Sequence, residues 1–306
     1  MNMEKIQFAG EGGVTLPGVL WLPEGGPRAV FQIAHGMTEH MGRYGRLAQA
    51  LIEKGVAVAG FDLRGHGENP GDPDCASFGE GGWEASLEDM HRFSLSLRQR
   101  FPEARHYMLG FSLGSFLLRE YLNRYPEPLS GAVILGTGHQ PDAVLSLMMA
   151  IVKGQIRQAG FDKTTPLVKK LTFESYNQKF RPNRTPSDWL CEDREQLDAY
   201  RADPLCRENI SAGLFWQLLG AMKRTGGRHA YDHWNKDLPV LLLSGENDPV
   251  GDFGKGVCRV KRAMDRSGFT HVTMHLIPNA RHDLFHEEKS GAAENARRIL
   301  TDWLSR

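Results

Sequence analysis

Ser112 lies between two glycines, in Gly110-Phe111-Ser112-Leu113-Gly114, where a short apolar run meets a helical pattern. A serine on a tight turn from strand to helix stands clear of the backbone, so its hydroxyl can attack a carbonyl carbon. A side chain at either glycine would crowd the crossing of strand and helix. The pattern predicts Ser112 as a nucleophile and the backbone N–H of Leu113 as a donor to an oxyanion. A simple turn of small residues is the alternative interpretation.

A nucleophilic serine needs a base, and the base needs an acid that orients it. Asp248 follows an apolar run that ends at Leu243, and His282 follows one that ends at Ile277. The carboxyl ends of parallel strands open into one crevice, so we expect Ser112, Asp248 and His282 to meet there. The sequence thus predicts a triad in the order Ser, Asp, His.

Other residues in the same loops could take these two roles. Glu246 and Asp252 are rivals for the acid, and His286 is a rival for the base. Asp248 is preferred to Glu246 because it lies further from the strand end. His282 is preferred because we expect His286 to begin the last helix. Asp248 as a turn former before Pro249 is the structural alternative.

His35-Gly36-Met37 leaves a buried strand toward the same crevice, so the N–H of Met37 is the candidate second donor to the oxyanion. His35 with His40, or His282 with His286, would supply imidazoles for a metal. No H-E-x-x-H is present, and the serine mechanism already uses His282. We therefore predict no metal and no cofactor.

The apolar runs predict a doubly wound α/β fold. Strands and helices alternate with short connections, and this rhythm indicates a parallel sheet covered on both faces. It stops near residue 140, where helices and loops follow, and resumes after residue 231. We predict a core of residues 1–139 and 232–306, with a helical cap, residues 140–231, inserted after the sixth strand. The expected strands are 5–8, 15–21, 29–34, 56–61, 107–109, 132–135, 240–243 and 271–277, and the expected core helices are 44–54, 85–100, 116–125, 254–266 and 291–304.

The composition argues against several classes of protein. Lys plus Arg and Asp plus Glu each number 37 in 306 residues, and no basic run with aromatic residues occurs, so nucleic-acid binding is not expected. The four cysteines are far apart, as in a protein of a reducing compartment. No signal-peptide core or membrane-length apolar run is present. We expect a cytoplasmic protein.

These residues resemble the α/β-hydrolase superfamily. More narrowly, they are similar to its monoacylglycerol lipase and lysophospholipase branch, which has serine aminopeptidase S33-type domains. The matching segments run in family order: His35 to His40 with Arg43-Tyr44, Asp62 to Gly67, Gly110 to Gly114, Gly245 to Pro249, and Ala280 to Asp283. The resemblance implies an eight-stranded, mostly parallel sheet, and it implies Ser112, Asp248 and His282 as the triad with Met37 and Leu113 as oxyanion donors. Phe111, Leu113 and Asp283 depart from the residues common in the lipase branch, which puts the substrate in question.

The predicted cap is expected to place an apolar roof over Ser112. Candidate pocket residues are His35, Phe111, His139, Met148, Met149, Phe215, Trp216 and Val250. The apolar run from Ala143 to Val152 is too short to span a membrane, and it lies in a stretch, residues 142–181, with seven basic and three acidic residues. Such a helix can contact an anionic lipid surface transiently, although packing within the cap is the simpler interpretation.

The sequence therefore predicts a serine hydrolase of acyl esters, acting through an acyl-enzyme on Ser112. A small-molecule ester or lipid of the monoacylglycerol or lysophospholipid type is the expected substrate. A short-chain carboxylesterase is the alternative. A serine peptidase of the aminopeptidase type would need an acidic recess for a free amine, and the Glu192-Asp193 pair is interpreted as a solvated helix face. A non-catalytic ligand-binding protein of the same fold is disfavoured by the complete triad.

Overall fold

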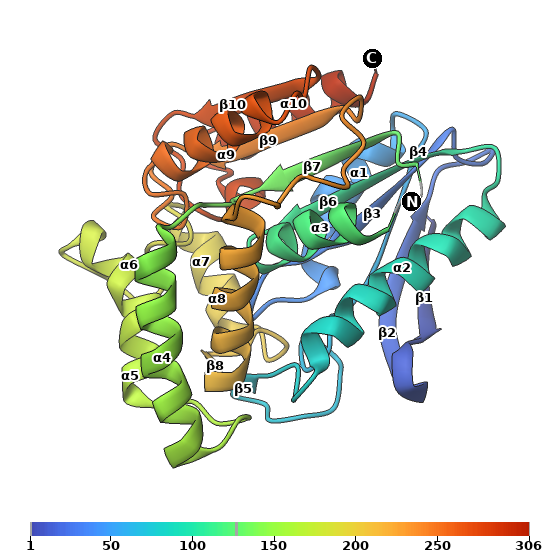
Figure 1. The fold of residues 1–306 in the computed structure, drawn as a ribbon. Coiled ribbons are helices and arrows are strands. Elements are labelled where there is room, and N and C mark those ends of the chain that lie inside the picture. Colours follow the sequence, from blue (N-terminus) through green and yellow to red (C-terminus); the bar gives the residue numbers. More distant parts are fainter. Residues whose placement is uncertain (1, 126–127, 306) are drawn as a thin grey trace.

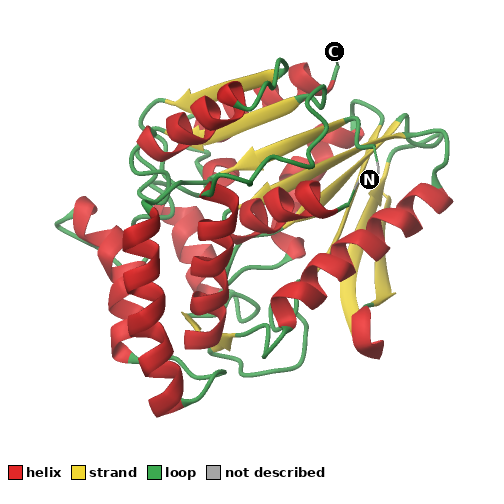
Figure 2. Ribbon diagram, in the orientation of Figure 1, coloured by secondary structure: helices red, strands yellow, loops and turns green. Residues whose placement is uncertain are grey.

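The computed structural model describes residues 2–125 and 128–305. Its centre is an eight-stranded sheet with the order β1-β2-β4-β3-β6-β7-β9-β10 (Figures 1 and 2). The hairpin of β1 and β2 is antiparallel and joins β4 antiparallel, and the remaining neighbours are parallel. The strands are β1 (Asn2–Ala9), β2 (Thr15–Leu22), β3 (Ala29–Ala34), β4 (Val56–Phe61), β6 (Arg105–Phe111), β7 (Gly131–Leu135), β9 (Val240–Gly245) and β10 (Val272–Ile277).

Helices cover both faces of this sheet. The helices α2 (Gly82–Arg100), α3 (Leu113–Arg124) and α9 (Lys255–Arg266) contribute to one apolar core, while α1 (Gly45–Ile52) and α10 (Ala292–Leu304) contribute to the other. Every residue of β3 and β4 is buried, as expected for strands with helices on both sides. This arrangement confirms the α/β-hydrolase fold that the sequence predicts.

The segment between β7 and β9 contains no strand of the central sheet among the residues described. It holds α4 (Asp142–Ala159), α5 (Pro166–Lys169), α6 (Ser175–Asn177), α7 (Arg194–Ala202) and α8 (Ala212–Gly226). The helices α4 and α8 pack side by side at one end of the sheet (Figure 1). The short strand β8 (Asn209–Ile210) pairs with β5 (Cys75–Ala76), so a second small sheet joins this segment to the loop after β4.

One difference from the expected elements bears on the site. His286 belongs to the short 3-10 helix η5 (Leu284–His286), and the last helix begins only at Ala292, so the expectation that His286 begins it was wrong.

The other 3-10 helices are η1 (Glu11–Gly13), η2 (Met41–Tyr44) and η4 (Gln178–Phe180), and Lys170–Glu174 form a π-helical turn, η3. Within residues 2–125 and 128–305, no helix is both long and apolar enough to cross a membrane.

The turn from β6 into α3 leaves no room for side chains at its two glycines. An ideal Cβ on Gly114 would lie 2.1 Å from the carbonyl oxygen of Ala34, and one on Gly110 would lie 2.2 Å from that of Gly114. Real Cβ atoms do not approach backbone oxygens this closely, so the strand and the helix would have to separate. The close approach explains why the sequence requires glycine on both sides of Phe111-Ser112-Leu113.

We expect Gly114→Ala to lower the free energy of unfolding by about 3 kcal/mol or more, because overpacking against backbone has no flexible side chain to absorb it. Gly154→Ala is the matched control, since an ideal Cβ on Gly154 of α4 meets no other atom within 4 Å. That variant should be unchanged or more stable by about 0.5–1 kcal/mol. Urea denaturation followed by circular dichroism measures both, and equal stabilities of the two variants would contradict the packing argument.

Candidate active site

Ser112 lies on the turn between β6 and α3 in a strained backbone conformation. Its φ of 51° is in the region that L-residues with a side chain rarely adopt. The turn is held because the Ser112 N–H donates to the carbonyl of Leu135 at 2.9 Å, while the N–H and the hydroxyl of Ser115 both donate to the Ser112 carbonyl. The strained turn therefore places the Ser112 hydroxyl at the carboxyl end of the sheet, where it can reach the carbonyl carbon of a substrate.

The structure brings the predicted triad together. His282 Nε2 lies 2.8 Å from Ser112 Oγ, and His282 Nδ1 lies 2.8 Å from Asp248 Oδ2. His282 and Asp248 are buried, so water does not compete for these contacts. An ionised carboxylate only accepts, so Nδ1–H donates to Asp248 and Nε2 is left to accept the proton of Ser112.

The Asp248 carboxylate is oriented by further donors. Its Oδ1 accepts the N–H of Val250 at 2.8 Å, and its Oδ2 accepts the hydroxyl of Ser244 at 3.2 Å. The rival acid Asp252 instead pairs with Arg259 on the surface. The rival base His286 contacts Asp283 and the carbonyl of Arg43. Asp248 and His282 are thus the acid and base that contact each other.

The two candidate oxyanion donors lie in separate elements beside Ser112. Leu113 is the first residue of α3, where N–H groups have no partner within the helix. Met37 follows β3 by a short loop and lines the small pocket, of about 20 Å³, that contains Ser112 and His282. The positive end of the α3 dipole points in the same direction as the Leu113 N–H, which favours negative charge there.

His35 anchors the start of the Met37 loop as a neutral imidazole. Its Nε2 accepts the N–H of Leu63 at 2.9 Å and its Nδ1 contacts the carbonyl of Gly36 at 2.7 Å, so one nitrogen accepts while the other donates. Burial lowers the pKa of His35 to about 4. The neighbouring His66 is also buried, and burial lowers its pKa to about 3. Both rings therefore stay neutral at physiological pH.

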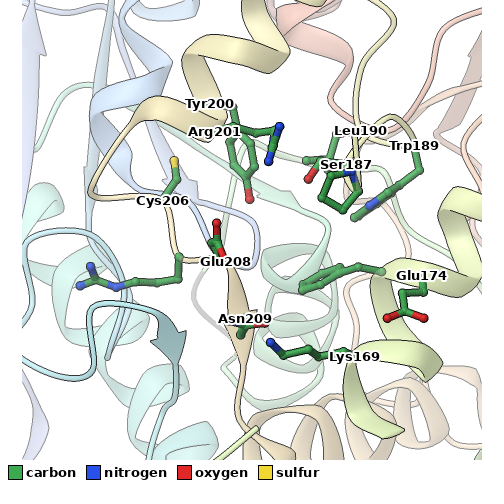
Figure 3. Close-up of a pocket in the computed structure, with 13 residues that line it drawn as sticks. Lys169, Glu174, Ser187, Trp189, Leu190, Tyr200, Arg201, Cys206, Glu208 and Asn209 are labelled. Atoms are coloured by element: carbon green, nitrogen blue, oxygen red, sulfur yellow. The ribbon is translucent and has the colours of Figure 1, made fainter. Parts of the chain in front are cut away.

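A larger cavity of about 220 Å³ adjoins the small pocket. The two share the side chains of Phe173, Trp189, Leu190 and Tyr200, which lie along their common boundary. In Figure 3, Tyr200 points into the space from above and Glu208 points toward it. Four charged residues that line the cavity are exposed at its rim: Lys169, Glu174, Arg201 and Glu208. Mostly aromatic side chains thus separate the pocket at Ser112 from the cavity, and charged side chains lie at the outer edge of the cavity.

The predicted apolar roof was wrong for most of its residues. Of the candidate pocket residues, Phe111 lines the pocket at Ser112, and its ring centroid lies 4.9 Å from that of His282. Met148, Met149, Phe215 and Trp216 belong to the apolar core around α4 and α8, because the two helices bury these side chains against each other and the core.

His35, His139 and Val250 also lie outside the lining of the pocket and the cavity. His35 is fully buried behind the Met37 loop, as its contact with Leu63 shows. His139 lies close to Gly226 at the end of α8, with burial lowering its pKa. Val250 contributes its backbone N–H to Asp248 instead of a side chain to the pocket.

A buried ion-pair network beside the triad was missed by the sequence analysis. Arg43 pairs with Glu39, and its Nη2 lies 2.6 Å from Asp283 Oδ2. The Glu39 carboxylate also accepts the N–H of Gly36 at 2.6 Å and the hydroxyl of Tyr44 at 2.8 Å. Burial acts to raise the pKa of Asp283, but the neighbouring Arg43 and His286 together outweigh it and hold that pKa well below its ordinary value. The residue types were visible in the sequence, but nothing in it paired Arg43 with the distant Asp283.

Trp189 is the other missed residue. Its ring centroid lies 5.1 Å from that of His282, so a residue of the segment between β7 and β9 covers the base directly. The sequence analysis placed this tryptophan in the cap without a role. An apolar residue in a segment without regular periodicity gives no signal of which core residue it covers.

Within the described ranges, one group of side chains has the chemistry of metal ligands: His40, Asp203 and Cys206, whose ligand atoms lie within 4.8 Å of one another. Both nitrogens of His40 already have partners, since Nε2 lies 2.8 Å from Asp203 Oδ2 and Nδ1 accepts the N–H of Gly42. Burial raises the pKa of the Cys206 thiol, which disfavours the thiolate that a metal binds. These observations give no reason to change the prediction of no metal.

Comparison with known families and proteins gives a consistent set of matches. The model of the family described as "Serine aminopeptidase, S33" matches residues 25–289. A monoacylglycerol lipase of Mycolicibacterium smegmatis is 27% identical over 289 residues, which cover 92% of this chain and 90% of that protein. The monoglyceride lipase of Mus musculus is 26% identical over 281 residues, covering 88% and 84% of the two chains.

Among solved structures, a thermostable carboxyl esterase from Bacillus coagulans in complex with glycerol superposes with a TM-score of 0.85 at 22% identity and covers 99% of each chain. A superposition of this quality over the whole chain shows that the two proteins have the same fold.

We expect the stability of the protein to fall as the pH drops from 6.5 toward 4. In that range an unfolded histidine binds a proton, whereas His35 and His66 with pKa values of about 4 and 3 do not when folded. The unfolded state then holds more protons, so each histidine removes up to about 1.4 kcal/mol of stability per pH unit. Urea denaturation at pH 7.5, 6 and 5 measures the slope. His66→Phe should make it shallower and His229→Gln, at the exposed His229, should not; a flat pH profile of the wild type would contradict this account.

Proposed function

Because the chain belongs to the serine aminopeptidase S33 family of α/β-hydrolases, we propose that it is a serine hydrolase that cleaves carboxylic acyl esters of the monoacylglycerol or lysophospholipid type. The observation that carries the proposal is the unbroken contact from Ser112 Oγ through the His282 ring to Asp248, at 2.8 Å on both sides of the ring. The relatives named as monoacylglycerol and monoglyceride lipases support an ester of glycerol as the substrate.

The first half of the reaction forms an acyl-enzyme. The Ser112 oxygen attacks the ester carbonyl carbon while His282 Nε2 takes the hydroxyl proton, and Asp248 stabilises the resulting imidazolium. The N–H groups of Met37 and Leu113 would hold the negative oxygen of the tetrahedral intermediate. When the intermediate collapses, the bond to the alcohol breaks and His282 gives its proton to the leaving oxygen.

The second half returns the enzyme to its starting state. A water molecule enters the position of the departed alcohol, and His282 takes one of its protons as its oxygen attacks the acyl carbon. The same two N–H groups hold the second oxyanion. Collapse of this intermediate breaks the bond to Ser112, which recovers its proton from His282 while the carboxylic acid leaves.

We propose that residues 140–231 act as a cap over this centre. Trp189, from this segment, contacts the His282 ring. Phe173, Leu190 and Tyr200, from the same segment, line both the pocket at Ser112 and the adjoining cavity. The charged rim of Lys169, Glu174, Arg201 and Glu208 is suited to a polar head group such as glycerol or a zwitterionic phosphodiester.

The outer face of α4 supports a transient contact with a lipid surface. Val144, Leu147 and Ile151 are 44%, 64% and 38% exposed and follow each other at helical spacing, so they form one apolar stripe. Lys153 and Arg157 lie on the same helix and would favour an anionic surface. The cytoplasmic location stays a prediction from the sequence.

Ser112→Ala should abolish ester hydrolysis, with a loss of about 10⁴-fold or more, because no other group can form the acyl-enzyme. Initial rates are measured on 1-monoacylglycerols and nitrophenyl esters from acetyl to palmitoyl. Wild-type activity that Ser112→Ala retains would refute the nucleophile, and turnover of aminopeptidase substrates without esters would refute the ester class.

Leu147→Glu should weaken binding to vesicles of phosphatidylglycerol by about tenfold, because a buried leucine side chain contributes roughly 1.5–3 kcal/mol. Co-sedimentation with such vesicles measures the binding. The matched control is Leu95→Glu, since Leu95 is also exposed, at 37%, but lies on α2 of the core. Equal vesicle binding by the wild type and the two variants would contradict the contact through α4.

A further inference from the structure

Thr38 follows the candidate oxyanion donor Met37 in a conformation that threonine rarely adopts. Its φ is 64°, in the left-handed region, where a β-branched side chain is strained. Such a conformation persists only where the surrounding contacts fix it. The loop that carries the Met37 N–H therefore depends on whatever holds Thr38.

The contacts that hold Thr38 from outside the loop come from the segment between β7 and β9. The Thr38 hydroxyl lies 2.8 Å from the hydroxyl of Tyr200 on α7. The carbonyl of Thr38 accepts the N–H of Arg207 at 3.1 Å. Both sides of the Thr38 residue, side chain and backbone, are thus tied to the same short stretch of chain, residues 200–207.

A third tie joins the same two segments at the other end of the loop. His40 Nε2 lies 2.8 Å from Asp203 Oδ2, and the imidazole also caps η2 through the N–H of Gly42. On the loop side of these contacts, Thr38 and His40 are largely shielded, since they are 4% and 7% exposed. Asp203 lines neither the pocket at Ser112 nor the adjoining cavity, so its contact with His40 serves the loop and not the substrate.

From the opposite side, the core fixes the loop through the buried ion pairs. Glu39 accepts the N–H of Gly36, and Arg43, which pairs with Glu39, lies over the Tyr200 ring at 4.9 Å from its centroid. Tyr200 is therefore held on one face by a cation of the loop itself while its hydroxyl holds Thr38. The loop and residues 200–207 form one connected set of contacts.

We propose that Tyr200 and Asp203 are positioning residues for the oxyanion hole, so that the Met37 N–H points at the reacting oxygen only while residues 200–207 are docked on the loop. This inference rests on the proposed function, because it assigns the docked state to the stabilisation of an oxyanion. Neither residue donates to the oxyanion; each acts through Thr38 or His40.

The kinetic test measures kcat and KM of Tyr200→Phe and Asp203→Ala on a short nitrophenyl ester. We expect kcat to fall about tenfold and KM to change by less than about twofold. The fall in kcat is smaller than the roughly 10²–10³-fold loss caused by removing a whole oxyanion donor, because the Met37 N–H is misplaced and not removed. Asp203→Asn keeps an acceptor oxygen and should recover most of the loss. Tyr125→Phe, which removes a 3.0 Å hydroxyl contact with Glu88 away from the site, is the matched control and should keep the wild-type values.

Thr38→Gly separates this role from direct contact of Tyr200 with the substrate. Glycine adopts a positive φ without strain, so the loop should no longer need the Tyr200 hydroxyl. In the Thr38→Gly background we expect Tyr200→Phe to change kcat by less than about threefold. An undiminished tenfold loss in that background, or a change confined to KM, would overturn the proposal.

Hydrogen exchange tests the same inference without any substrate. Tyr200→Phe and Asp203→Ala should speed exchange of the backbone amides in residues 36–44, while peptides of α3 should exchange as in the wild type. Unchanged exchange in residues 36–44 would overturn the proposal whatever the kinetics show. If the two variants exchange faster in residues 36–44 as expected but the wild type hydrolyses no ester, the proposed function is contradicted. The coupling of the two segments is then still supported.

Discussion

The crossing of β6 and α3 at Gly110 and Gly114 is the constraint on which the rest of the site depends. Backbone atoms of α3 touch both the strand before Ser112 and the end of β3, as the 2.1 Å from an ideal Cβ on Gly114 to the Ala34 oxygen shows. This contact sets the start of α3, and thus the Leu113 N–H, against the end of β3. The Met37 loop leaves β3 at that point, so the candidate donors on Met37 and Leu113 both lie close to Ser112. No side chain could produce this arrangement if the backbones were further apart.

Much of the core could be predicted from the sequence because its elements obey local rules. The apolar runs predict the eight strands of the sheet, and the carboxyl-end rule for parallel strands predicts the contact of Asp248 and His282 with Ser112. The segment between β7 and β9 could not be predicted in this way. Met148 and Phe215 were correctly seen as apolar, but periodicity does not say which surface an apolar face covers. They pack between α4, α8 and the core, and the roof of the pocket is made by Trp189 and Tyr200 instead.

Buried charge was the other feature that the sequence did not disclose. Asp283 lies far from Glu39 and Arg43 in the chain, and each of the three alone would be expected at the surface. Burying such charges is costly unless each is paired and hydrogen-bonded, and removal of one partner would leave the others uncompensated. The network joins the Met37 loop to the residue that follows His282. Its ion pairs fix the position of this loop relative to the residue beside His282.

The helical segment presents different chemistry on different elements. Residues 200–207 contact the Met37 loop through hydrogen bonds and a cation–π contact, while the apolar stripe of Val144, Leu147 and Ile151 lies on α4 and faces solvent. The helix α4 packs on α8, and the bonds that hold Thr38 and His40 come from Tyr200, Asp203 and Arg207. A lipid surface that binds the α4 stripe therefore does not contact the groups that hold the oxyanion loop.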